Sequence, residues 1–99
     1  MTTDPFPAEK FGQAVDTLLT ADELLGGRLL DAFQWPIAEV DPMKHKLPEA
    51  VSQVLRNIRQ EIISHGSEAA WIESLDDVAK KRTARWVLKS SEALEAELG

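Results

Sequence analysis

Residues 48–65 have the most regular hydrophobic pattern in the chain. Apolar side chains recur there every three or four positions, so an α-helix would gather them into one stripe about 100° wide and leave polar side chains on the other side. The stripe consists of Val51, Val54, Leu55, Ile58 and Ile62. Pro48 suits the first turn of a helix, and Gly66 suits the position just after the last turn. The pattern therefore predicts an amphipathic helix whose buried face is centred on Ile58.

The rest of the chain shows the same period in other segments. It predicts four more helices, over residues 7–19, 21–34, 68–73 and 75–97. The alternation of apolar and polar residues that marks a β-strand does not occur. A chain of 99 residues, 43% of them hydrophobic and 28% charged, is long enough for one core of its own. We therefore expect a single all-α domain over residues 1–99, folded as a small four- to five-helix bundle.

Local signals mark where two of these helices begin. Thr20 and Glu23 have the spacing of a capping box before the second helix, and Ser74 and Asp77 have it before the last. Residues 8–34 also fit one continuous helix, because a single apolar face passes through both halves. We favour two helices. The last helix is predicted to be about 35 Å long, against about 27 Å for the longest of the others, so its end should extend beyond the bundle.

Residues 35–47 are predicted to form a loop, because two prolines interrupt them and a third follows. The loop combines apolar side chains with charges of both signs, as the core and rim of an interface do. It either folds back as a lid over the bundle or forms part of an exposed binding patch. Its candidate contact residues are Trp35, Ile37, Val40, Met43, Lys44 and Lys46. Trp35 thus differs from Trp71 and Trp86, which are expected to meet in the core across the turn at Ser74.

Residues 80–89 carry five basic side chains and no acidic one. On a helix, most of them fall within a sector about 100° wide beside the apolar stripe. These are Lys81, Arg82, Arg85 and Lys89. Such a patch can contact nucleic-acid phosphates or an acidic protein, and its plainest interpretation is a solvated face. Asp76 and Asp77 stand where the last helix would approach a duplex, and their carboxylates would repel phosphate oxygens.

The net charge of −6 also opposes nucleic-acid binding. The whole excess lies in residues 1–43, which hold eight acids against two bases, whereas residues 44–99 hold nine of each. Nucleic acid is therefore not expected to be the main partner.

The residues that carry catalysis and metal binding are scarce. The absence of cysteine excludes thiol catalysis, disulfides and cysteine-based zinc sites. His45 and His65 lie too far apart in the sequence to form a helical metal-binding motif. No nucleophile elbow and no glycine-rich phosphate loop occurs. We expect no enzymatic activity, no catalytic or metal-binding residue and no cofactor.

The sequence favours a protein that acts through contact with another protein, as an adaptor, an inhibitor or an accessory subunit. No stretch approaches the ~20 apolar residues of a membrane span, and residues 1–7 lack the features of a signal peptide, so we expect no membrane contact and a cytoplasmic location. The favoured surface is the loop, joined by the basic face of the last helix. The end of that helix could also mediate a homo-oligomer. The alternative is a nucleic-acid-binding regulator that uses the basic face.

Overall fold

The computed structural model describes residues 5–20 and 24–98, and 80% of these residues are helical. No strand occurs among them, so the prediction of an all-α bundle is confirmed. In chain order the elements are α1 (Phe6–Thr20), α2 (Leu25–Gln34), the 3-10 helix η1 (Ile37–Glu39), α3 (Glu49–His65), α4 (Glu68–Glu73) and α5 (Asp77–Leu98). Residues 8–34 therefore contain two helices. The expected N-cap at Thr20 is wrong, because Thr20 belongs to α1 and α2 begins at Leu25 after its N-cap Leu24; Glu23, the other residue of the predicted capping box, lies outside the described residues.

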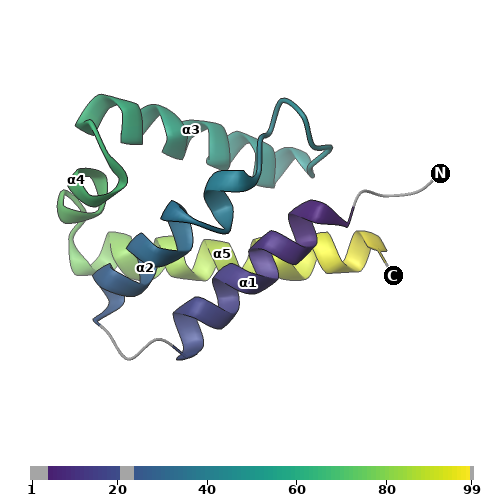
Figure 1. Ribbon diagram of the computed structural model, residues 1–99, viewed down its shortest axis with the longest axis horizontal. Coiled ribbons are helices and arrows are strands. Elements are labelled where there is room, and N and C mark those ends of the chain that lie inside the picture. The colour runs from purple at the N-terminus through teal and green to yellow at the C-terminus, as the bar shows by residue number, and fades with distance from the viewer. Residues whose placement is uncertain (1–4, 21–23, 99) are drawn as a thin grey trace.

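The first and last helices pack against each other, with α1 crossing in front of α5 in the view of Figure 1. α1 packs along α5 and against α2, and α2 packs in turn on α4. α3 packs on the short helix α4, which leads the chain from α3 into α5, so that α3 and α5 run in opposite directions. This arrangement places α3 at the edge of the molecule.

Aromatic rings tie α2 to the helices on either side of it. The Phe33 ring of α2 lies edge-on to Trp71 at a centroid distance of 5.1 Å and parallel to Trp86 at 6.4 Å. Trp86 also meets Phe11 of α1 edge-to-face at 5.6 Å. The two tryptophans were expected to meet directly across the turn at Ser74. They are joined through Phe33 instead, because α2 inserts that ring between α4 and α5.

The last helix begins two residues later than the sequence suggested. The Asp76 carboxylate accepts a hydrogen bond from the Ala79 backbone N–H at 2.8 Å and so caps the first turn. The Ser74 hydroxyl, the expected cap, donates instead to the carbonyl of Trp71 at 2.5 Å. The Leu75 N–H bonds back to Ile72, so these residues still complete the end of α4. The predicted Ser74 capping box is therefore wrong.

Two predictions about burial also need correction. Val51 and Leu55 are buried on α3, but Ile58 is only half-buried, because open space borders its side of the helix. The end of α5 was expected to extend beyond the bundle. Leu94 is buried, because α1 packs on this part of α5, and only the last turn, residues 95–98, is exposed as expected.

Candidate contact surfaces around α3

The loop over residues 35–47 divides into a buried part and an exposed part. Ile37 and Val40 are 1% and 0% exposed, and they belong to the hydrophobic core. These two residues were predicted to contact a partner, and that prediction is wrong because η1 folds back onto the bundle. Trp35 and Met43 are 57% and 81% exposed. Lys44 and Lys46 are exposed beside them in sequence.

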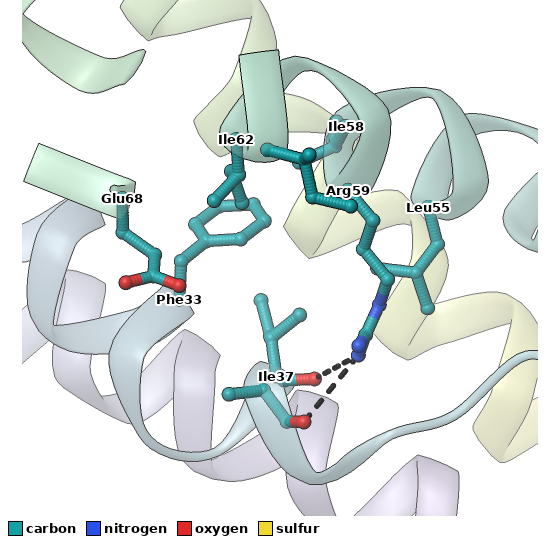
Figure 2. Close-up of a pocket in the computed structure, with 9 residues that line it drawn as sticks. Phe33, Ile37, Leu55, Ile58, Arg59, Ile62 and Glu68 are labelled. Carbon is teal, nitrogen blue, oxygen red and sulfur yellow. Dashed lines mark hydrogen bonds between the residues drawn. The ribbon is translucent and has the colours of Figure 1, made fainter. Parts of the chain in front are cut away.

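Arg59 of α3 holds the buried part of the loop in place. Its Nη2 donates hydrogen bonds to the carbonyl oxygens of Ile37 at 3.2 Å and Ala38 at 3.4 Å, and also to that of Val40. Figure 2 shows the guanidinium reaching from α3 to the first two of these oxygens. The Ile37 oxygen also accepts the backbone hydrogen bond of η1 from the Val40 N–H at 3.0 Å, so Arg59 adds a second donor there. The sequence analysis missed Arg59, although its place one turn after Leu55 on the apolar side of the helix was a signal.

A second set of contacts joins the loop to α1. The Lys10 ammonium lies 2.5 Å from the Glu39 carboxylate. It also lies 5.1 Å from the centroid of the Trp35 ring and 5.4 Å from that of Phe6. The cation–π contact occupies one face of Trp35. The exposed indole therefore has a structural role of its own, in addition to any contact with a partner.

Side chains of α3 line three hollows on successive sides of the helix. The first, which we call the core hollow, has a volume of about 220 Å³ and lies between α3 and α2 (Figure 2). Phe33, Ile37 and Ile62 form its apolar walls, and Glu68 and Arg59 lie at its edges. Because the core hollow is small and η1 closes one side of it, it offers little space for a macromolecular partner.

The second hollow, which we call the α3–α5 groove, has a volume of about 360 Å³. Its walls are the facing sides of two antiparallel helices, and residues at the α4 end form its floor. The lining residues are Val54, Asn57, Ile58 and Glu61 of α3, Trp71 and Leu75 at the α4 end, and Ala79, Arg82, Thr83 and Trp86 of α5. The interior is therefore apolar and the polar side chains are at the rim, as in a protein-binding site.

The third hollow, which we call the Met43 hollow, has a volume of about 310 Å³ and lies on the opposite side of α3. It brings Met43 of the loop together with Ile63, which is 78% exposed. Arg56 and Gln60 complete its α3 wall. The opposite placement follows from helix geometry, because these α3 residues are about half a turn away from those of the α3–α5 groove.

The basic face of α5 adjoins the α3–α5 groove. Arg82 lines the rim, and the other three bases follow it around the helix away from the groove, in the order Lys89, Arg85 and Lys81. All four side chains are exposed. Among the described residues, none of the four forms a salt bridge.

The structure does not unite the predicted contact residues in one surface. Met43 lies in the Met43 hollow, whereas Arg82 lies in the groove on the other side of α3. The sequence analysis identified Arg82 but assigned most of the apolar groove residues to the core. Periodicity shows which face of a helix is apolar, but it does not show how far away the next helix lies.

Residues 5–20 and 24–98 contain no cluster of three or more histidine and acidic side chains that could hold a metal ion. Nor does any helix in these ranges combine the length and hydrophobicity needed to cross a membrane.

Comparison of the chain with protein-family models, with curated proteins and with solved structures gives no significant match. The arguments about function therefore start from the surfaces described above.

Proposed function

We propose that this protein has no catalytic activity and acts by binding a helical segment of another protein in the α3–α5 groove. It would serve as an adaptor, an inhibitor or an accessory subunit in the cytoplasm. The observation that carries the proposal is an open apolar channel between two antiparallel helices with polar groups along its rim. Grooves of this kind bind the apolar face of an amphipathic helix.

The residues of the groove support this mode of binding. Trp86 packs against the ring of Phe33, so it loses little conformational freedom when a partner covers its exposed part, whereas Trp71 is 2% exposed and already belongs to the core. Tryptophan is also enriched in the cores of protein interfaces. Ile58 is half-buried and leaves part of its apolar surface for the ligand.

A matched pair of α3 variants tests the proposal. Val54→Glu places a carboxylate in the groove, and Ile63→Glu places one in the Met43 hollow on the other side of the helix. Both change a β-branched residue to a better helix former, so neither should weaken α3. We expect the wild-type chain to retain a protein partner from native cell extract at ~0.5 M salt, at which phosphate-based binding is weak.

Val54→Glu should lose that partner and Ile63→Glu should keep it. Equal retention by both variants would contradict the groove as the site. Loss by Ile63→Glu alone would move the site to the Met43 hollow.

The alternative is a nucleic-acid-binding regulator, favoured by the four exposed bases on α5. Asp76 and Asp77 are exposed at the start of the same helix, where they oppose phosphate. Titration with duplex and single-stranded DNA and RNA at low salt separates the two functions. Submicromolar affinity that falls on changing Arg82 and Arg85 to alanine would favour the alternative.

A further inference from the structure

We infer that the segment bound in the α3–α5 groove is a short acidic amphipathic helix from a partner protein. This inference rests on the proposed function and adds the chemistry of the ligand. The charges on the two walls and the length of the groove support it.

The two walls of the groove differ in charge. On the α5 side, Arg82 forms the rim and Arg85 and Lys89 extend it outwards. On the α3 side the outward-facing residues are neutral and polar, apart from Glu61. A ligand helix in the groove would therefore have an uncompensated basic surface along one flank. Acidic side chains on that flank are complementary to it, and basic ones are repelled.

The bases are available for such a ligand. Within residues 5–20 and 24–98 they form no ion pair that would have to be broken. Each exposed ion pair contributes little by itself. Several together select between partners and increase the rate of association, because their fields add.

The groove also limits the length of the ligand. Its α3 wall runs from Val54 to Glu61, which corresponds to about 10 Å along the helix axis. That distance equals two helical turns. The ligand should therefore insert apolar side chains at positions i, i+3 or i+4, and i+7.

Synthetic peptides provide the test. The first is a helical peptide of fourteen residues with leucine at i, i+4 and i+7 and glutamate on the flanking positions. The second has lysine in place of each glutamate, and the third keeps glutamate but has alanine in place of each leucine. Affinity is measured by fluorescence anisotropy of labelled peptide. The site is identified from the indole N–H signals of the three tryptophans in ¹H–¹⁵N spectra.

We expect the glutamate–leucine peptide to bind about tenfold more tightly than the lysine peptide, and the alanine peptide to bind least. Binding should shift the indole signals of Trp71 and Trp86 and leave that of Trp35 unchanged. Arg82→Glu combined with Arg85→Glu and Lys89→Glu should reverse the preference. The matched control reverses three exposed bases that do not line the groove, Lys44, Lys46 and Arg56, and should leave the preference unchanged.

The outcomes separate this inference from the proposed function. Binding at Trp71 and Trp86 that ignores peptide charge, or a preference for lysine, would overturn the acidic ligand and leave the groove as the site. If neither leucine-containing peptide binds at these tryptophans, both the inference and the proposed function are overturned. If the charge-reversed variant does not fold by circular dichroism, Arg85→Gln with Lys89→Gln replaces it, and an unchanged preference there also overturns the inference.

Two further occupants are covered by the same experiment. A free chain that sediments as a dimer, and becomes a monomer with Val54→Glu, would identify the occupant as a second copy of the chain. Tighter binding of RNA or DNA than of the glutamate peptide, lost in the charge-reversed variant, would assign the basic face to nucleic acid. Either result overturns the inference that the ligand is an acidic helix of a partner protein.

Discussion

Arg59 connects the loop to α3 through a single planar group. Its guanidinium donates to backbone carbonyls of η1 and its C-cap; the Ile37 carbonyl also accepts from the Val40 N–H at 3.0 Å. Its Nε is buried without a hydrogen-bond partner among the described residues, so Arg59 is held by the geometry of these carbonyls. The guanidinium has the donors for several acceptors at once, which a lysine ammonium cannot supply in the same planar arrangement.

Replacing Arg59 with methionine should keep the aliphatic stem and remove the hydrogen bonds. We expect the free energy of unfolding to fall by about 2 kcal/mol, because the carbonyls of Ile37 and Val40 lose a charged donor. Arg56→Met is the control, since Arg56 is exposed on the same helix, and it should change stability by less than ~0.5 kcal/mol. Urea denaturation measures both variants. Equal effects would mean that the loop does not depend on Arg59.

The difference in burial between Leu55 and Ile58 gives a second prediction. Leu55 is 1% exposed, and Leu55→Ala should cost about 3 kcal/mol through lost burial and the cavity that remains. Ile58 lines two open hollows, so Ile58→Ala removes less buried surface and leaves no closed cavity. It should cost about half as much in the same denaturation experiment. If Ile58→Ala lowers the free energy of unfolding more than Leu55→Ala does, the buried face of α3 is centred on Ile58, as the periodicity of the sequence predicted.

At the scale of the element, short-range signals predict helices better than they predict the residue that caps them. The side chains of Asp76 and Ser74 can both cap a helix. Which of them caps α5 depends on where α4 ends, and the packing of α4 on α2 and α3 determines that end. We expect Asp76→Ala to lower the free energy of unfolding by about 1 kcal/mol. Asp77→Ala, which removes a carboxylate from the same turn, should cost about half of that through the helix dipole alone. Thermal denaturation of the two variants distinguishes the capping hydrogen bond of Asp76 from the effect of a negative charge near the start of the helix. A larger effect for Ser74→Ala than for Asp76→Ala would contradict the assignment of Asp76 as the cap.

The five helices and most of the core could be predicted from the sequence, because periodicity and proline positions act over a few residues. The α3–α5 groove could not be predicted in this way. Whether Val54 and Trp86 meet another helix or open space depends on how α3 and α5 are placed, and α4 fixes that placement from outside both segments. The role of Arg59 was hidden for the same reason, since its partners lie 19 to 22 residues away in the sequence.

At the scale of the whole molecule, α3 should be the least stable of the long helices. It lies at the edge of the bundle and has hollows on three sides, whereas α1 and α5 pack along each other. We therefore expect amide hydrogens of α3 to exchange with solvent faster than those around Val87 of α5. Native-state hydrogen exchange followed by NMR measures this difference. The glutamate–leucine peptide should slow exchange in α3 more than in α1, and uniform protection across the helices would argue against a loosely packed α3.

The pairing of α1 with α5 has a consequence for the order in which the chain can fold during its synthesis. α1 leaves the ribosome before α5, and the helix that covers its Phe11 side is made only when residues 77–98 have been added. Until then Phe11 lacks the Trp86 ring, and its side of α1 remains uncovered. A nascent chain that has not yet reached Trp86 therefore exposes this apolar side of α1, even though α2 can already pack on another side. A premature stop before Trp86 would leave this side of α1 permanently uncovered, as a surface on which a chaperone would act.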